Sequence, residues 1–394
     1  MDMMGRRMSE QKGNPTVVAA AAAFPPNCTV SQRESVAKVS PMAMTACPDN
    51  TWLLEDNETT KAITTPTTTT RSLLRSMISG SDNKEDRPIL FEPSHGRPPL
   101  GMFVGCNKGI DAVDTLRFLS QNTIYDKKTW IHALDLPNPK GVCNTNTKPQ
   151  ITIEANQHPR QAKLYCIEAM PSTFGKLQQA TQKLGWQESF VVHHAAMSNS
   201  NGYIPFPNHE TIPGYESLGI EDCETKPEIC QNVALYTLDT FFEQHVQEQQ
   251  LSPATTILDF LSIDVEGFDI FVLRGAKSTL QKTKYVEFEV HNKGAWKNVP
   301  LETAITELEQ QDFVCYYAGT GGKLWRLTDC MTGPLMNIWS NVACVNVRLA
   351  PNLAQHMEDI FLKTIENWDH TEAQNRTMTL WQIIAYTVTS RLKE

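Results

Sequence analysis

The stretch LDFLSIDVEGFDIFVLRGA (258–276) places Asp264, Glu266 and Gly267 at the end of an apolar run. Six of the nine residues at 257–265 are large and apolar, which predicts a buried strand. The segment after Gly267 has helical spacing. Because a buried carboxylate is costly unless another group pairs with it, the two acids are expected to face a cleft or a partner.

Strand-like runs alternate with helical patterns through the middle of the chain. The expected parallel strands are LGMFVG (100–105), AKLYCIE (162–168), FVVHHAA (190–196), ILDFLSID (257–264) and KYVEFEVH (284–291). Helical spacing follows three of them, at 111–119, 172–184 and 269–280. This alternation predicts an α/β fold in which helices cover both faces of a mostly parallel, Rossmann-like sheet. Two later runs, at 312–319 and 341–349, are expected to close the sheet as a hairpin.

Three regions are expected along the chain. Residues 1–85, with TTPTTTT at 64–70, have the composition of a low-complexity, disordered arm. Residues 86–350 are expected to form the folded domain, and 351–394 helices that pack on it. The first of these helices has an apolar face made of Leu353, Met357, Ile360, Phe361, Ile365 and Trp368.

Composition restricts the partners and leaves the compartment open. The net charge of −9 argues against nucleic acid as the main partner, since phosphate binding needs a basic face. No apolar run is long enough to predict a transmembrane segment. Ten cysteines without a CxxC pair do not predict a dense disulfide framework, and Cys223 and Cys230 are either a disulfide or two thiols. We expect a soluble protein, with the cytoplasm favoured over the secretory pathway.

A glycine turn follows the first expected strand, in VGCNKGID (104–111). Gly105 and Gly109 let the backbone approach a ligand closely, and the following helix adds partial positive charge at its N-terminus. A dinucleotide fingerprint would have glycine at Asn107, and a P-loop would end in Gly-Lys-Ser/Thr. Cys106 indicates only that a small side chain is needed there.

Glu168 is the last residue of the second expected strand. A carboxylate there can accept hydrogen bonds from ribose hydroxyls, because ligands of open α/β sheets bind beyond the carboxyl ends of the strands. The alternative is a solvated acid at a strand end.

The quoted motifs resemble those of one family. VGCNKGIDA, LYCIEAMPSTFGKL, VVHHAAMSNSNGYIPF, LYTLDTFF and LSIDVEGFDIFVLRGA occur in the order found in FkbM-type methyltransferases, over about residues 98–295. The resemblance implies a class I, S-adenosylmethionine-dependent methyltransferase with a seven-stranded sheet and an antiparallel last strand. It also implies O-methylation of a hydroxyl on a small-molecule, glycan or natural-product-like acceptor.

The resemblance implies a cofactor site at the carboxyl ends of the strands. The loop would lie under the methionine and ribose of S-adenosylmethionine, the acid of the second strand would hold the ribose hydroxyls, and two alanines would lie near adenine. These residues, with the acid beside the transferring methyl group, are Gly105, Asn107, Gly109, Glu168, Ala195, Ala196 and Asp264.

The sequence departs from the family at two places. Phe103 stands where the family usually has an acid, which weakens the case for a hydrogen bond to the amino-acid end of the cofactor. In addition, 63 positions separate Gly105 from Glu168, against about 20 in a compact unit. The extra stretch, including LDLPNPKGVCNTNTKP (134–149), is either a lid or a passive surface insertion.

Three residues are candidates for catalysis. Asp264 is expected to face the cleft and take the hydroxyl proton of the acceptor, whereas Glu266 either joins it or caps the next helix. His291, at the end of the fifth strand, is either a general base or structural. Asp264, His291 and Asn292 are too sparse a set of ligands to predict a metal.

In the helical segment after the strand at 257–264, Asp269 and Arg274 are expected on the surface of the helix, and Gly275 at its end.

Two other functions remain open. One is a nicotinamide-dependent oxidoreductase on a similar sheet, against which Asn107 counts. The other is a catalytically silent relative that binds a cofactor or a partner, which Phe103 favours.

Overall fold

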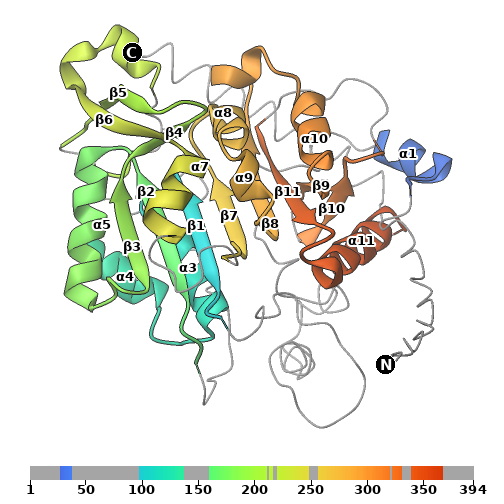
Figure 1. Ribbon diagram of the computed structural model, residues 1–394, viewed down its shortest axis with the longest axis horizontal. Helices are drawn as coiled ribbons and strands as arrows, with labels where there is room; N and C mark the ends of the chain where they lie inside the picture. Colours follow the sequence, from blue (N-terminus) through green and yellow to red (C-terminus); the bar gives the residue numbers. More distant parts are fainter. Residues whose placement is uncertain are drawn as a thin grey trace, which may run out of the picture.

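The body of the molecule is an eight-stranded sheet with helices on both faces (Figure 1). The computed structural model describes residues 27–37, 97–136, 159–210, 213–215, 220–247, 256–319, 322–330 and 339–366. The strand order is β10-β9-β11-β8-β7-β1-β2-β3. Five strands run parallel to one another: β1 (Leu100–Val104), β2 (Lys163–Glu168), β3 (Phe190–His194), β7 (Phe260–Ile263) and β8 (Tyr285–Val290).

The remaining strands complete the other side of the sheet. β11 (Ser340–Asn346) lies between β8 and β9 (Phe313–Ala318) and runs antiparallel to both. The sheet has eight strands rather than the expected seven, because the short β10 (Leu324–Arg326) pairs with the outer edge of β9. The two late apolar runs therefore pair as expected, with an additional strand between them in sequence.

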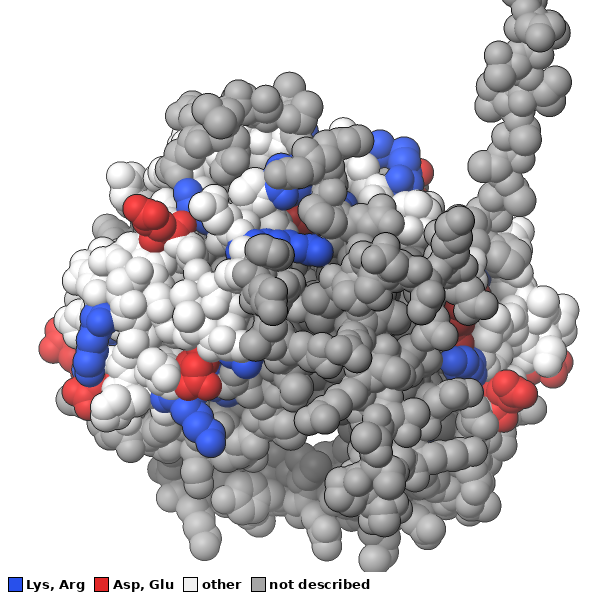
Figure 2. All heavy atoms as spheres, turned by 90° about the horizontal axis from the view of Figure 1, so that it is seen from below, with Lys and Arg blue, Asp and Glu red and all other residues white. Residues whose placement is uncertain are grey.

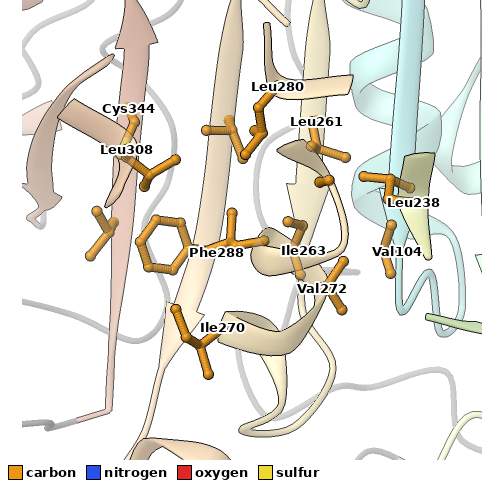
Figure 3. Packing of buried hydrophobic residues seen from close by; sticks show 14 of the residues in the cluster. Val104, Leu238, Leu261, Ile263, Ile270, Val272, Leu280, Phe288, Leu308 and Cys344 are labelled. Atoms are coloured by element: carbon orange, nitrogen blue, oxygen red, sulfur yellow. The ribbon is translucent and has the colours of Figure 1, made fainter. Parts of the chain in front are cut away.

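Each face of the sheet has its own apolar core, which explains why the parallel strands read as continuous apolar runs. One face is covered by α3 (Ile110–Ser120), α4 (Lys127–Leu134), α5 (Pro171–Leu184) and α11 (Pro351–Glu366). The other is covered by α7 (Leu238–Phe241), η6 (Phe242–Gln247), α8 (Asp269–Arg274), α9 (Lys277–Leu280), η8 (Gly294–Lys297) and α10 (Leu301–Glu309). Figure 3 shows this second core, where Ile263 and Phe288 pack against Ile270 and Val272.

A second, three-stranded sheet continues from the edge of the first. Its order is β4-β6-β5, from β4 (Ala196–Ser198), β5 (Gly202–Pro207) and β6 (Cys230–Thr237). The run FVVHHAA, expected as one strand, is thus divided at Ala195 between the two sheets. Two short helices, α6 (Asp222–Thr225) and η5 (Pro227–Ile229), precede β6, and a Cys223–Cys230 disulfide joins α6 to the first residue of β6.

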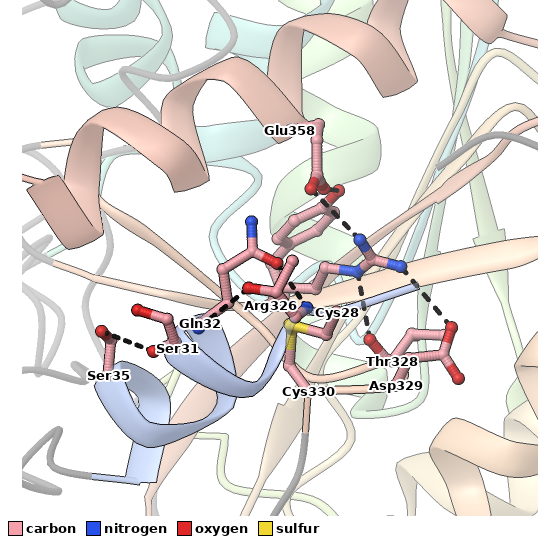
Figure 4. Close-up of a disulfide and its surroundings, with 11 residues drawn as sticks. Cys28, Ser31, Gln32, Ser35, Arg326, Thr328, Asp329, Cys330 and Glu358 are labelled. Atoms are coloured by element: carbon pink, nitrogen blue, oxygen red, sulfur yellow. Dashed lines mark hydrogen bonds and ion pairs between the residues drawn. A yellow bond between two sulfur atoms is a disulfide. The ribbon is translucent and has the colours of Figure 1, made fainter. Parts of the chain in front are cut away.

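The described part of the N-terminal arm is a helix attached to the body. α1 (Val30–Ala37) begins just after Cys28, which forms a disulfide with Cys330 (Figure 4). The rest of residues 1–85 lies outside the described residues. α11 buries Leu353, Met357, Ile360 and Phe361, as its apolar spacing predicts, whereas Trp368 lies outside the described residues.

All eight cysteines in the described ranges form disulfides: Cys28–Cys330, Cys106–Cys166, Cys223–Cys230 and Cys315–Cys344. None of the described helices combines the length and the apolarity that a membrane-spanning segment needs. On the face shown in Figure 2, the described acidic and basic side chains are interspersed.

A buried ion pair joins α11 to the edge of the sheet (Figure 4). Arg326 is 1% exposed, and its Nη1 lies 3.1 Å from Oε1 of Glu358. Its Nε donates to the carbonyl oxygen of Thr328, and the hydroxyl of Tyr316 donates to the other oxygen of Glu358. Nη2 of Arg326 also lies 3.6 Å from Oδ2 of Asp329, which is partly exposed, so buried Glu358 is the closer counter-charge of Arg326.

Removing the charge of Glu358 should destabilise the fold. We expect Glu358→Gln to lower the free energy of unfolding by about 3 kcal/mol, because buried Arg326 then keeps only the partly exposed Asp329, 3.6 Å away, as a counter-charge. Urea unfolding measures the change. The control is Asp359→Asn on the same helix, an exposed residue whose loss of charge should matter by less than about 0.5 kcal/mol. Equal effects of the two substitutions would contradict the assignment.

Candidate functional site

The glycine loop at 105–109 lies at the carboxyl edge of the parallel strands, between β1 and α3. Gly105 has a φ of 79°, and a Cβ there would lie 1.7 Å from the backbone oxygen of Asp264 at the end of β7. Gly109 has a φ of 65° and caps α3. Its missing side chain leaves room for Leu177 and Trp130. The loop therefore has the shape of a tight cradle that only glycine permits at its two ends.

Glu168 fixes the middle of this loop. Its Oε2 accepts a hydrogen bond from the backbone N–H of Asn107 at 2.7 Å, and its Oε1 accepts one from Met170 at 2.8 Å. The side chain is buried, and burial raises the pKa of Glu168 to about 7, opposed by these hydrogen bonds and by nearby Lys108. The alternative that Glu168 is a solvent-exposed acid at the end of a strand is therefore wrong.

Asn107 carries an unsatisfied oxygen at the centre of the loop. It has a left-handed φ of 48°, and its Oδ1 is buried without a hydrogen-bond partner among the described residues. Gly214 lies over this atom, and its N–H donates to the hydroxyl of Thr173 on α5. A buried acceptor without a donor costs free energy unless a bound group supplies one.

A disulfide joins the same loop to β2. The N–H groups of Gly105 and Cys106 both donate to the carbonyl oxygen of Ile167 at 3.0 Å. Cys106 is bonded to Cys166, whose side chain is fully buried. The expectation that Cys106 marks only a small side chain is therefore wrong.

The two alanines expected near adenine are both buried. The N–H of Ala195 donates to the carbonyl oxygen of Glu168, so the end of β3 lies beside the end of β2. Ala196 begins β4 and packs in the small core of the second sheet. The structure thus brings Ala195 to the edge that holds Glu168.

Phe103 belongs to the core rather than to this edge. It is buried on β1 and stacks on Phe260 with ring centroids 5.5 Å apart, and Phe260 stacks on Tyr285. The stack runs across three neighbouring strands. The departure from the family pattern at Phe103 thus has a packing role.

Asp264 and Glu289 meet at the end of β7 and β8. Asp264 is exposed and is hydrogen-bonded to the carboxyl group of Glu289, whereas Glu289 is buried. Burial raises the pKa of Glu289 to about 8, and the neighbouring acids add to the rise. Burial therefore favours the protonated form of Glu289, whereas its hydrogen bonds with Trp339 and Asp264 lower the same pKa.

His291 is held by Glu289 and Trp339. Its Nε2 lies 2.6 Å from Oε2 of Glu289, and its ring stacks on Trp339, whose indole N–H donates to the same carboxyl group. Burial lowers the pKa of His291 to about 4, so the imidazole is neutral at pH 7. Asn292 beside it is exposed.

Glu266 pairs with Lys293 and does not cap the following helix. It has a left-handed φ of 58°, so the extended geometry of β7 does not continue to Gly267. α8 begins at Asp269 without a side-chain cap. Glu266, Glu289 and His291 offer ligand atoms within 4.8 Å of one another, but the Lys293 ammonium and the bond between Glu289 and His291 already occupy them.

Two expectations for the helix after β7 have clear outcomes. Asp269 is fully buried rather than on the surface. One of its oxygens accepts from the N–H of Val265, and burial raises the pKa of Asp269 well above its usual range. Gly275 ends α8 as expected, and a Cβ there would lie 2.1 Å from the carbonyl oxygen of Ser198.

Three features of the site were not predicted from the sequence: Glu289, Lys293 and the disulfide partner of Cys106. Glu289 and His291 are two apart on one strand, so they share a face, and Val286, Phe288 and Val290 form the opposite one. This alternation was the available signal. Lys293 lies on a loop, and cysteine spacing does not give connectivity.

The fold defines an α/β protein with a mostly parallel sheet, and the cradle is a candidate ligand site beyond the carboxyl ends of its parallel strands. Residues 143–315 match the model of the methyltransferase FkbM domain, which confirms the resemblance and supports a methyltransferase. The match begins after the glycine loop.

Among solved structures, methyltransferase FkbM from Methylobacillus flagellatus KT is similar at 10% identity with a TM-score of 0.34. The similarity covers 63% of this chain and 44% of the Methylobacillus chain, so this chain spans less than half the length of the Methylobacillus protein. No curated protein matches the chain.

Adding a side chain at Gly105 should destabilise the edge of the sheet. We expect Gly105→Ala to lower the free energy of unfolding by at least about 2 kcal/mol, because the left-handed backbone disfavours a side chain and Asp264 occupies its place. Gly175→Ala within α5 is the control: that position is open, and alanine should stabilise the helix by up to about 1 kcal/mol. Urea unfolding of both variants decides, and a neutral Gly105→Ala would contradict the close approach.

Proposed function

We propose that the protein is an S-adenosylmethionine-dependent methyltransferase that O-methylates a hydroxyl of a glycan or natural-product-like acceptor. The observation that carries the proposal is the cradle at 105–109, in which Asn107 has a buried, unpartnered Oδ1 and donates its backbone N–H to the Glu168 carboxylate. The family match over 143–315 supports the transferase class.

The cradle fits the chemistry of this cofactor. The Glu168 carboxylate accepts backbone N–H groups from Asn107, Met170 and Ala169. Since a carboxylate has about four acceptor positions, one remains with which it can accept a ribose hydroxyl. Asn107 Oδ1 would accept from a donor of the cofactor, and the small side chain of Ala195 lies at the same edge of the sheet, beside Glu168. Bound S-adenosylmethionine would supply a methyl group activated by its positively charged sulfur.

Asp264 is the proposed acceptor-side base. It is the exposed member of the carboxyl pair with Glu289, so its carboxylate is the one that can reach, orient and deprotonate a hydroxyl of the acceptor. His291 supports this arrangement by its bond to Glu289, and the pair of Glu266 with Lys293 borders it. The acceptor would lie towards residues 203–231, where Tyr203 and Tyr215 are exposed.

A silent, cofactor-binding relative is the second candidate. Phe103 favours it, since its stacked ring supplies no acid to the amino-acid end of a cofactor. A nicotinamide-dependent enzyme is less well supported, because Asn107 replaces the glycine that lets a dinucleotide approach.

The cofactor assignment predicts pH-dependent binding of S-adenosylhomocysteine. Ribose hydroxyls donate to ionised Glu168, so the ligand selects the deprotonated form of a group whose pKa is about 7. We expect the affinity to be about tenfold weaker at pH 6 than at pH 8. Isothermal titration of the full chain measures this, with NAD titrated separately.

The matched variant is Glu168→Ala, which should bind weakly and without this pH dependence. Binding of NAD instead would favour the oxidoreductase, and binding of neither ligand would overturn the cofactor site.

If Asp264 acts as the base, its substitution should slow methyl transfer without weakening cofactor binding. We expect Asp264→Asn to bind S-adenosylhomocysteine like wild type and to transfer radiolabelled methyl groups at least about a hundredfold more slowly to any hydroxylated acceptor that wild type accepts. The control variant is Asp239→Asn on α7, which makes the same change of carboxylate to amide away from the proposed site. The Asp239 carboxylate accepts hydrogen bonds from the N–H groups of Ser278 and Thr279. Cofactor binding by wild type without transfer to any acceptor would favour the silent relative.

A further inference from the structure

We infer that the Cys106–Cys166 disulfide is a positioning element of the cofactor site: it holds the loop at 105–109 in its binding geometry, so tight cofactor binding needs this bond. The inference rests on the proposed function. It assigns the bond a role that the other three described disulfides do not share.

The disulfide is the covalent member of a set of tethers between the loop and the end of β2. Cys106 is bonded to Cys166, Gly105 and Cys106 donate to Ile167, and Asn107 donates to Glu168. Three successive residues of the loop are thus fastened to three successive residues of the strand. The set determines where Asn107 Oδ1 and the Glu168 carboxylate lie relative to each other.

The sequence of the loop permits the observed conformation but does not by itself select it over others. Gly105, Asn107 and Gly109 all have left-handed φ angles, which a flexible glycine-containing loop samples among many others. Without the covalent link, a ligand would have to order the loop on binding, and this cost would appear as lost affinity. The bond therefore acts through Asn107 and Glu168 rather than by touching the ligand.

The Cys315–Cys344 disulfide offers a matched comparison. It joins directly opposed residues of β9 and β11, both fully buried, and none of the residues of the glycine loop contacts it through a described bond. The two bonds span 29 and 60 residues, and disulfide stabilisation changes only with the logarithm of this length. Their loss should therefore lower stability similarly while affecting the cofactor site differently.

The first test compares two double variants of the full chain. We expect Cys106→Ala/Cys166→Ala to bind S-adenosylhomocysteine about tenfold more weakly than wild type, and Cys315→Ala/Cys344→Ala to bind it like wild type. Thermal unfolding should show lower stability for both. Equal affinity in all three proteins would overturn the inference and leave the proposed function standing, whereas no binding to oxidised wild type would overturn both.

A second test uses wild type alone and does not depend on a variant that folds. Dithiothreitol reduces a disulfide by passing two electrons and two protons to its sulfurs, which gives two cysteine thiols and the cyclic disulfide of the reagent. If the bond strengthens ligand binding, the ligand must strengthen the bond by the same factor. The protein is equilibrated in dithiothreitol redox buffers with and without saturating S-adenosylhomocysteine, and each disulfide is quantified by alkylation and mass spectrometry.

The expected result is a shift of about tenfold in the reduction equilibrium of Cys106–Cys166, with none for Cys315–Cys344. A purely structural bond would not respond selectively in this way. Equal shifts of both disulfides, or no shift in either, would overturn the inference.

Discussion

The hydrogen bond from the N–H of Asn107 to the Glu168 carboxylate connects the loop after β1 to the end of β2. It requires a carboxylate to remain buried, which is unfavourable unless donors satisfy its oxygens. The backbone of the loop supplies one donor, and the N–H groups of Ala169 and Met170, just before α5, supply two more. The geometry of the edge is thus determined by the need to satisfy one buried acid, and the glycines permit the backbone path that achieves it.

The second group of acids follows a different rule. Around the end of β7, Glu289 is buried and Asp264 is exposed, so burial raises the pKa of Glu289 while the carboxyl group of Asp264 remains accessible. Lys293 balances Glu266, while Asp269 lies beneath them, out of water. The edge of the sheet therefore carries two acidic sites of different character, one formed by backbone donors and one by other side chains.

The sequence was most informative where burial is continuous. Runs such as 258–264 and 284–291 are apolar because both faces of the strand are covered, and their positions were predictable from this alone. The three strands of the second sheet were not, since they are short and partly exposed. Asp269 was misplaced because helical spacing does not tell which polar residue enters a core. Glu168 was found from its place at a strand end, whereas its backbone partners depend on the tertiary path of the loop.

The bond between Cys28 and Cys330 joins positions 302 residues apart. Helix α1 therefore remains covalently attached to the body through the side chain of Cys28, independently of the backbone that follows it. Proteolytic cleavage anywhere between residues 38 and 96 would convert the protein into a light and a heavy chain that remain linked by this disulfide under oxidising conditions. The two would separate only after reduction, and a change in apparent mass on reduction would reveal processing that a folded-state assay would miss.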